Sequence, residues 1–331
     1  MRVKESGIAG PASAKVTPAP AGSPSTGEAV LNKLKFEDLR IGPELGKGSQ
    51  GKVRIVQHRG TLEKFAMKYL IFEGNDIESQ RMALQAELRQ VEALKDANVV
   101  SSYEAFFRDG KLFILLEYMD CGTMKDIMRN HPEGIEEPKL AFIAREIMKG
   151  LRYLHESKVV HRDLKPANVL CNSKGEVKIS DFGVAKQFQT DATMFTLSSQ
   201  GSVAYMSPER IHSEPYSYSC DIWSVGVTIA ELALGEYPFG GKKSVYDLCQ
   251  VITASPVQIL WDRSSRTFSP ELKDFVTKCL NPIASRPSAS QLLEHPFLQS
   301  AKNAVVEEIG RYFHTQLEVK LDDMKEKKTE Q

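Results

Sequence analysis

The sequence lacks the features that would place it in a membrane or secreted class. No apolar run approaches the length of a membrane span, and the first residues contain no uninterrupted apolar core of a signal peptide. Position 2 is arginine, so we expect no N-terminal myristoylation. Basic and acidic residues are equal at 43 each, which gives no net field toward nucleic acid or an anionic membrane. We therefore expect a cytoplasmic protein that binds neither nucleic acid nor membrane.

Cysteines are few and scattered. The chain contains 5, an odd number, and none stands in a C-x-x-C pair. Disulfide frameworks and zinc sites both need paired spacings, so we expect reduced thiols of the kind found in the cytosol. With 331 residues, of which 41% are hydrophobic and 26% charged, the composition is that of an ordinary globular protein with a sizeable core.

The chain divides into three parts by composition and pattern. Residues 1–34 are rich in Pro, Gly, Ala and Ser and contain no aromatic residue, which is typical of a flexible tail. We expect one ordered domain over 35–299, with a small part at 35–117 and a large part at 118–299. In the large part, an apolar stripe predicts one amphipathic helix, and residues 221–234, apolar nearly all round, predict a buried helix. The stripe consists of Leu140, Ile143, Ile147, Leu151 and Leu154. A segment over 300–331 follows, in which apolar residues recur at helical spacing.

The most informative stretch reads H-R-D-L-K-P-A-N from position 161, and D-F-G follows from position 181. Between the two motifs, short apolar runs at 169–170 and 177–179 predict two brief strands either side of a turn at 172–175. Such a hairpin would bring Asp163, Asn168 and Asp181 to one rim. Asp163 can accept a proton from a hydroxyl nucleophile, and the other two side chains offer the hard oxygen ligands that Mg²⁺ prefers.

Residues 36–45 are expected to form a strand, which ends in a glycine-rich loop that begins at position 46. Gly46, Gly48 and Gly51 permit a tight turn whose backbone amides can approach phosphate oxygens. Dinucleotide-binding proteins carry similar loops, but a helix follows directly in those folds. Here Val53 and Ile55 alternate with polar residues, which predicts a second strand and a glycine-tipped hairpin.

A lysine and a glutamate accompany the glycine-rich loop. Ala66 and Lys68 share one face of the next predicted strand, so Lys68 is expected to point under the glycine loop. Helical spacing over 77–94 places Glu87 within an apolar stripe, where a carboxylate needs a partner. We expect that partner to be Lys68, and Glu92 is the alternative carboxylate.

Taken in this order, the motifs resemble those of a eukaryotic protein kinase from about Phe36 to Leu298. The resemblance implies an α+β, two-lobed protein-kinase fold. A small lobe of antiparallel β-sheet with one helix would be joined by a hinge to a larger, mainly helical lobe. It also implies ATP and Mg²⁺ as cofactors. Every catalytic position carries the expected residue type, which argues against an inactive relative.

The family's roles can be carried to the matching positions of this chain. Asp163 would orient and deprotonate the substrate hydroxyl, and Lys165 would neutralise charge on the transferred phosphoryl group. Asn168 and Asp181 would hold Mg²⁺.

The resemblance also assigns the nucleotide contacts. Lys68, oriented by Glu87, would hold the α- and β-phosphates. Glycines would cover the phosphates, apolar side chains would sandwich the adenine, and the hinge would offer backbone hydrogen bonds. The residues implied are Leu45, Gly46, Gly48, Gly51, Val53, Ala66, Leu116, Glu117, Met119 and Leu170.

Residues 201–210 read G-S-V-A-Y-M-S-P-E-R, which is similar to the G-T-x-x-Y-M-S-P-E-R of MAP kinase kinases. Ser202 keeps the hydroxyl of the usual threonine. The resemblance implies a monomeric dual-specificity Ser/Thr/Tyr kinase that phosphorylates a MAP kinase and is activated by a MAP kinase kinase kinase. Two alternatives remain: a Ser/Thr kinase of another tier with a different protein substrate, and an ATP-binding scaffold.

The segment after D-F-G is rich in hydroxyl groups. Arg162 beside the catalytic aspartate implies a loop switched by phosphorylation, because arginine can pair with a phosphate and order the segment. Ser198 falls on the family's second activating site. Thr193 and Thr190 both remain candidates for the first.

The resemblance implies supports around the site as well. Glu209 and Arg286 match a buried pair, and Asp221 matches a residue that braces the catalytic loop, with an ordinary surface charge as the alternative for each. The last segment has two open roles, which are docking of the activator and packing back on the large lobe. Its apolar stripe consists of Val305, Ile309, Phe313, Leu317 and Leu321.

Overall fold

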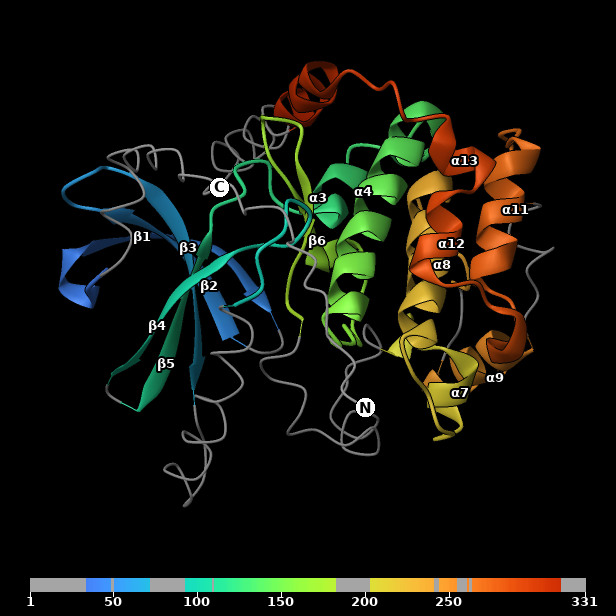
Figure 1. Ribbon diagram of the computed structural model, residues 1–331, viewed down its shortest axis with the longest axis horizontal. Coiled ribbons are helices and arrows are strands. Elements are labelled where there is room, and N and C mark those ends of the chain that lie inside the picture. Colours follow the sequence, from blue (N-terminus) through green and yellow to red (C-terminus); the bar gives the residue numbers. More distant parts are fainter. Residues whose placement is uncertain are drawn as a thin grey trace, which may run out of the picture. The chain divides into compact units, whose positions relative to one another are not determined.

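The structure is a computed structural model that describes part of the chain, and Figure 1 shows its helices and strands. The described residues from Phe36 onward belong to one compact unit. The described ranges are 34–48, 51–71, 93–108, 110–182, 203–240, 244–254, 261 and 264–316.

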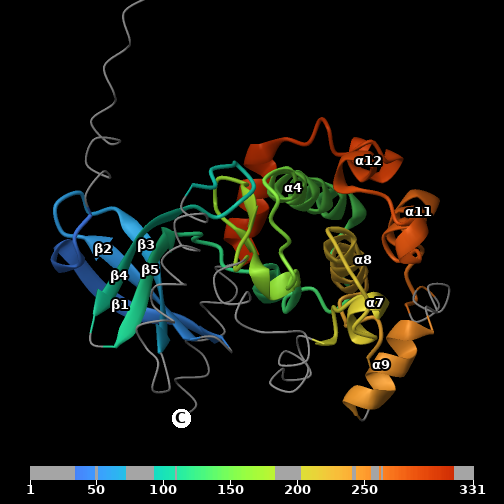
Figure 2. The same cartoon turned by 60° about the horizontal axis from the view of Figure 1, so that its bottom comes forward.

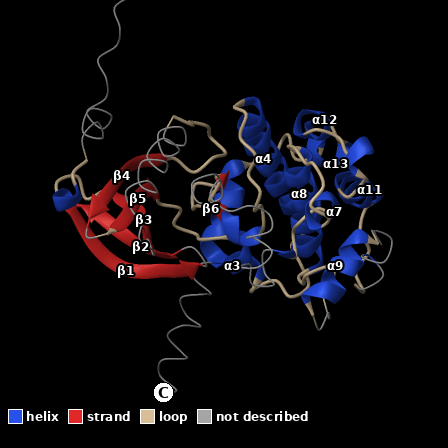
Figure 3. Cartoon of the chain, turned by 90° about the horizontal axis from the view of Figure 1, so that it is seen from below, coloured by secondary structure: helices blue, strands red, loops and turns tan. Residues whose placement is uncertain are grey.

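An antiparallel five-stranded sheet forms the small lobe, with the strand order β1-β2-β3-β5-β4. Figure 3 shows these strands gathered apart from the helices. In this register Val53 lies opposite Lys68, and Ala66 lies opposite Leu116. The strands are β1 (Leu39–Gly48), β2 (Gly51–His58), β3 (Lys64–Ile71), β4 (Ser102–Arg108) and β5 (Lys111–Glu117).

The first strand begins later than the sequence pattern suggests. A strand was expected from Phe36, but Phe36–Asp38 form a 3-10 turn, η1, and β1 starts at Leu39. The Phe36 ring packs edge-on against Phe106 and Phe113, with ring centroids 5.6 and 5.0 Å away. Because Phe36 packs across the sheet in this way, it is not part of the strand. The predicted start of β1 was therefore wrong by three residues.

Helices make up most of the remaining described residues. Residues 306–316 are also helical. Two further 3-10 turns are η2 (Pro166–Asn168) and η3 (Ile283–Ser285). The α-helices are α3 (Met124–Met128), α4 (Glu137–Glu156), α7 (Pro208–Ile211), α8 (Ser219–Leu234), α9 (Val245–Thr253), α11 (Pro270–Cys279), α12 (Ala289–Leu293) and α13 (Pro296–Gln299).

The helical lobe is built around α4 and α8. The stripe predicted for α4 is confirmed, because Leu140, Ile143, Ile147, Leu151 and Leu154 are fully buried. The buried character predicted for α8 is also confirmed, since every residue from Cys220 to its end is buried. Figure 2 shows α8 near both α4 and α11, and it contacts both helices.

The end of α8 packs backbone to backbone against the loop before α4. Gly235 ends α8 in the left-handed conformation, with φ of 76°, and a Cβ there would lie 2.2 Å from Pro132 O. A Cβ on Gly134 would lie 1.9 Å from Ala233 O. Both segments therefore exclude side chains at their contact.

The predicted catalytic hairpin is confirmed in outline. Strands β6 (Val169–Cys171) and β7 (Val177–Ile179) pair antiparallel, with Leu170 opposite Lys178. Gly175 closes the turn with φ of 82° and donates its N–H to Asn172 O at 3.0 Å. An isolated bridge links Ile179 to Val99.

The helix expected over 77–94 falls almost wholly outside the described residues. Its expected end was wrong, because Ala93 and Leu94 are not helical. Lys95 donates its backbone N–H to the Tyr153 hydroxyl at 2.9 Å, which directs the chain onto α4. Within the described ranges, no helix is long and apolar enough to cross a bilayer.

Candidate active site

A buried aspartate on α8 supports the catalytic loop through hydrogen bonds to its backbone. Asp221 is fully buried and accepts the backbone N–H groups of His161 and Arg162, both at 2.8 Å. Another partner of this carboxylate is the His155 ring, whose Nε2 lies 2.9 Å from Oδ2. Burial opposes ionisation of Asp221, but these hydrogen bonds and the nearby imidazoles outweigh it and hold its pKa below the usual value. The predicted bracing contact is confirmed.

Three predicted catalytic side chains meet at the loop. Lys165 Nζ lies 3.0 and 2.9 Å from the two carboxylate oxygens of Asp163. Asn168 Nδ2 donates to Asp163 Oδ2 at 3.0 Å and to its backbone carbonyl at 2.7 Å. These cationic and amide donors fix the orientation of the Asp163 carboxylate, which suits it to accept a proton from a positioned hydroxyl.

A long-range ion pair joins the sheet to the hairpin. Lys68 Nζ, on β3, lies 2.7 Å from Asp181 Oδ1, just beyond β7. The side chains are 11% and 36% exposed, so the pair lies at the edge of solvent. Ser180 donates its backbone N–H to Asn168 O at 2.9 Å, which places Asp181 beside the Asp163 cluster. The structure thus brings Lys68, Asp163, Asn168 and Asp181 to one locality.

Two residues in this locality have strained backbones. Arg162 has φ of 68° and Asp181 has φ of 61°, both in the left-handed region that side chains rarely adopt. Such a conformation costs about 1–3 kcal/mol per residue and persists only where its surroundings impose it. At Arg162 the surroundings include the Asp221 carboxylate and Arg210, whose Nη1 donates to Arg162 O at 2.7 Å.

The glycine loop is compatible with an approaching phosphate. Gly48 and Gly51 are partners at the tip of the β1–β2 hairpin, and Gly51 has φ of 146°. A Cβ added to Gly46 would meet no atom within 4 Å, so space lies open beside this backbone. Leu45 next to it is an exposed apolar side chain. A bound nucleotide could therefore pack against Leu45 and occupy the open space beside Gly46.

The remaining predicted nucleotide contacts lie on the sheet, the hinge and the hairpin. Met119 is buried, while Val53, Ala66, Leu116 and Leu170 are partly buried. Glu117 donates its backbone N–H to Ser101 O at 2.9 Å. The predicted residues Glu87, Thr190, Thr193 and Ser198 lie outside the described ranges.

The residues present fit a magnesium–nucleotide complex. Asn168 commits its Nδ2 to Asp163, so Oδ1 is the side-chain atom left to face a cation. Asp181 adds a carboxylate. Among the described residues no group of three or more His, Cys, Asp or Glu side chains could hold a metal. Mg²⁺ suits such a sparse set, because it usually binds one or two protein oxygens and completes its shell with phosphate and water.

Lys178 is a site residue that the sequence analysis missed. It lies opposite Leu170 in the hairpin, and its Nζ is 2.6 Å from Glu117 Oε1 in the hinge. The pair is largely buried and ties the hairpin to the hinge. One sequence feature could have identified Lys178, which lies between two apolar residues of a short strand. Because side chains alternate along a strand, Lys178 must point to the face opposite Val177 and Ile179.

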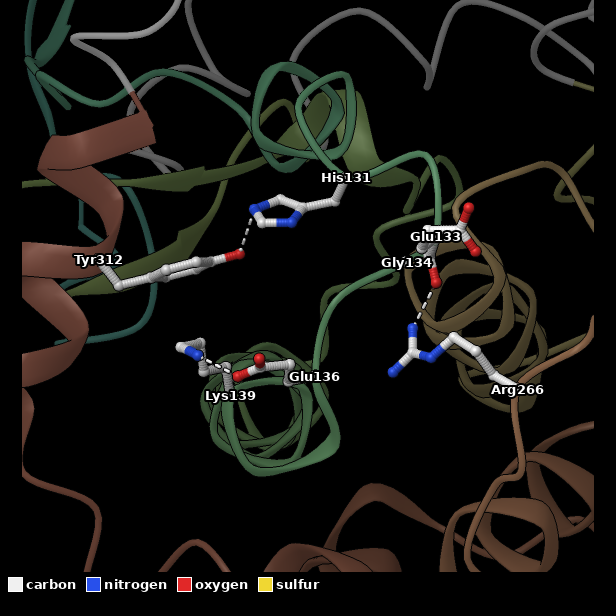
Figure 4. Close-up of a pocket in the computed structure, with 7 residues that line it drawn as sticks. All are labelled: His131, Glu133, Gly134, Glu136, Lys139, Arg266 and Tyr312. Carbon is white, nitrogen blue, oxygen red and sulfur yellow. Dashed lines mark hydrogen bonds and ion pairs between the residues drawn. The ribbon is translucent and has the colours of Figure 1, made fainter.

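A cavity of about 410 Å³ lies elsewhere on the helical lobe (Figure 4). None of its lining residues belongs to the predicted nucleotide set, so it is a separate feature. Its lining residues are His131, Glu133, Gly134, Glu136, Lys139, Arg266 and Tyr312.

Comparison with known proteins gives the family. A model of the protein kinase domain matches residues 39–298. Mitogen-activated protein kinase kinase 2 of Arabidopsis thaliana is 38% identical over 275 residues, which cover 81% of this chain and 74% of that protein. Mitogen-activated protein kinase kinase 1 of the same plant is 38% identical over 286 residues, covering 84% and 79%. Mitogen-activated protein kinase kinase SIPKK of Nicotiana tabacum is 36% identical over 299 residues, covering 88% and 82%.

These matches confirm the two-lobed fold and the family expected from the motifs. They agree with the geometry, in which Lys68 of the sheet pairs with Asp181 and Asn168 donates a hydrogen bond to Asp163. The chain belongs to the MAP kinase kinase family of protein kinases.

Proposed function

We propose that this kinase transfers the γ-phosphoryl group of Mg·ATP to the threonine and tyrosine of a MAP kinase activation loop. The observation that carries this proposal is the convergence of Lys68–Asp181 with Asp163, Lys165 and Asn168. Phosphoryl transfer depends mainly on positioning and charge neutralisation, and this cluster supplies groups for both. The family names of its relatives support the choice of substrate.

Each side chain has a defined task in this proposal. Asp163 accepts the proton of the substrate hydroxyl, with its carboxylate oriented by Lys165 and Asn168. Lys165 also offsets negative charge on the transferred group. Lys68 binds the α- and β-phosphates. Asn168 Oδ1 and the Asp181 carboxylate hold Mg²⁺, which when bound neutralises phosphate charge.

Activation of the enzyme is part of the proposal. Arg162 Nε is buried and has no hydrogen-bond partner among the described residues. An unsatisfied guanidinium nitrogen is costly, and a phosphate on the activation segment is a suitable acceptor. We assign that phosphate to Ser198, with Thr193 or Thr190 as the other activating site, placed there by a MAP kinase kinase kinase.

A cytoplasmic location is also proposed. Cys121, Cys171, Cys220, Cys249 and Cys279 are free thiols, which is usual in a reducing compartment.

The test uses the full chain with Ser198→Asp and Thr193→Asp, offered a catalytically dead MAP kinase and ATP. Mass spectrometry of the product should show phosphate on both the threonine and the tyrosine. Asp163→Asn should lower the rate by about 10²–10⁴-fold, because it removes the general base. Glu271→Gln, an exposed carboxylate on α11, is the matched control and should retain the rate.

Other results of this test would support the alternatives. Phosphate confined to serine or threonine of other proteins would indicate a kinase of another tier. Binding of an ATP analogue without any transfer would indicate a scaffold, and transfer that survives Asp163→Asn would indicate a contaminating kinase.

A further inference from the structure

The turn of the catalytic hairpin lies at the opposite end of its two strands from the predicted metal-binding residues. Asn168 precedes β6 and Asp181 follows β7, whereas Asn172 to Gly175 form the opposite end. Each strand has only three residues, and such a short hairpin is unstable without support from its surroundings. What holds the turn therefore bears on the position of Asn168 and Asp181.

One support of the turn comes from the hinge. Asp120 Oδ1 accepts the backbone N–H of Ser173 at 2.8 Å, and its Oδ2 accepts the Ser173 hydroxyl at 2.6 Å. The turn is also closed internally, because Asn172 Oδ1 accepts the N–H groups of Lys174 and Glu176 at 3.1 and 3.0 Å. The turn is thus a rigid unit attached to the hinge.

The second support is the helix at 306–316. A Cβ on Gly310 would lie 2.4 Å from Ser173 O and 2.9 Å from Gly175 N. Reciprocally, a Cβ on Gly175 would lie 2.3 Å from Val306 O and 3.1 Å from Gly310 N. The helix and the turn therefore touch through their backbones, and two glycines permit the approach.

The helix is itself anchored to the large lobe. Phe313 is fully buried and Ile309 nearly so. The Tyr312 hydroxyl lies 2.9 Å from His131 Nε2, as Figure 4 shows. Asn130 Nδ2 donates to Gln316 O at 3.0 Å. With these anchors the helix cannot readily retreat if the turn is pushed against it.

We propose that helix 306–316 is a positioning element for phosphoryl transfer, and that Gly310 is its contact residue. By closing against the turn, the helix fixes the hairpin between itself and Asp120, and so sets the placement of Asn168 and Asp181. This inference rests on the proposed function, because those two residues matter through the metal–nucleotide complex. It assigns no substrate contact to the helix.

The test is Gly310→Ala in the full chain. The added methyl needs a displacement of the turn or the helix, since a contact of 2.4 Å is far inside the ordinary range. Misplacement of reacting groups by about 1 Å can cost 10²-fold in rate, so we expect kcat to fall roughly ten- to a hundredfold. The KM for the MAP kinase should stay unchanged, because the proposed role of the helix involves no contact with the substrate.

Two variants control the result. Glu308→Ala changes an exposed residue of the same helix and should leave kcat unchanged. Gly60→Ala changes an exposed turn glycine of the small lobe, where the nearest atom is a His58 ring carbon at 3.3 Å, and should also be neutral. Tyr312→Phe removes the bond to His131 without adding volume, so it should loosen the helix and lower kcat by less.

Amide hydrogen exchange supplies a readout that does not require catalysis. In Gly310→Ala and Tyr312→Phe, exchange should rise in peptides covering 169–179, while α8 stays protected. Wild-type kcat in Gly310→Ala, an equal loss in Glu308→Ala, or a uniform rise in exchange would each overturn the proposal. If the wild-type protein phosphorylates no MAP kinase, the proposed substrate fails, but the exchange pattern still decides whether the helix fixes the hairpin.

Discussion

At the scale of single residues, the site depends on charged side chains that are buried in the protein. Asp221 is the clearest case, because a fully buried carboxylate holds the catalytic loop by its backbone. Its pKa is lowered in the folded protein, since the hydrogen bonds and imidazoles favour the ionised form more than burial opposes it. Its contribution to stability must therefore depend on pH.

The sign of that dependence follows from the lowered pKa. The stabilisation is complete above the unfolded-state pKa of about 3.9, and it is lost as pH falls through the lower folded-state value. We expect Asp221→Asn to reduce the free energy of unfolding by about 3 kcal/mol at pH 7. The difference from wild type should shrink below about pH 4, as the wild-type carboxylate becomes protonated.

Urea unfolding across this pH range measures both effects. Asp247→Asn, a partly buried carboxylate on α9, is the control and should cost less than about 1 kcal/mol. A difference between Asp221→Asn and wild type that stayed constant down to pH 2 would contradict the assignment of this carboxylate as a charged brace.

The spacing of motifs along the chain predicts which distant residues lie close together in the fold. Lys68 and Asp181 stand far apart in the chain, and their pairing at 2.7 Å agrees with the convergence expected from the motifs. Lys178 was missed because its importance depends on a partner in the hinge that local pattern does not reveal. The left-handed backbone of Arg162 and Asp181 was also not predictable, since it is imposed by tertiary contacts.

At the scale of elements, α7 is fastened to the lobe by one buried ion pair. Arg286 Nη1 lies 2.7 Å from Glu209 Oε1 and Nη2 lies 3.2 Å from Oε2, with the side chains 0% and 4% exposed. Arg286 also stacks on Trp223 and donates to the carbonyls of Asn281 and Ser219. The buried pair expected from the sequence is confirmed, and the surface-charge alternative is wrong.

Breaking the Arg286–Glu209 pair should strongly destabilise the folded protein. Arg286→Met would leave the Glu209 carboxylate buried without its partner, so we expect a loss of about 3–5 kcal/mol in the free energy of unfolding. Combining it with Glu209→Gln should cost less than the sum of the two single changes. Lys278→Met, at an exposed pair with Asp274, is the control and should cost about 0.2–1 kcal/mol.

Denaturant unfolding of the four proteins in this cycle provides the measurement. Additive losses, or a loss in Arg286→Met no larger than in Lys278→Met, would show that the buried pair has no special role.

Elements with a strong period were the most predictable. The stripes of α4 and α8 have helical periodicity or continuous apolarity, so their type and position followed from pattern. The start of β1 did not, because the contact of Phe36 with Phe106 and Phe113 is made across the sheet. In the helical stripe predicted from Val305, Ile309 and Phe313 are buried but Val305 is exposed. Leu317 and Leu321, the last two residues of that stripe, lie outside the described ranges.

At the scale of the whole molecule, activity is proposed to depend on phosphorylation of the segment that follows D-F-G. Ser198→Ala should lower activation by the upstream kinase at least about tenfold, because one or more charge-assisted hydrogen bonds from arginine would be lost. Thr193→Ala and Thr190→Ala, tested separately, would identify the other site by which of them lowers activation.

Phosphorylation of a dead MAP kinase after incubation with the upstream kinase measures this switch. Ser217→Ala, an exposed hydroxyl outside the segment, is the control and should leave activation unchanged. Full activation of Ser198→Ala would remove this residue from the switch.

The contact of Gly134 with the end of α8 has a consequence for how the chain reaches this structure. Ala233 O and Pro132 O occupy the space that side chains at Gly134 and Gly235 would need, so we expect each segment to take its final position only when the other is in place. During synthesis the loop before α4 leaves the ribosome long before α8 does, and domains generally fold as units. We therefore expect the loop to reach its native conformation only after α8 has been synthesised, so that the large lobe completes its folding in one cooperative step.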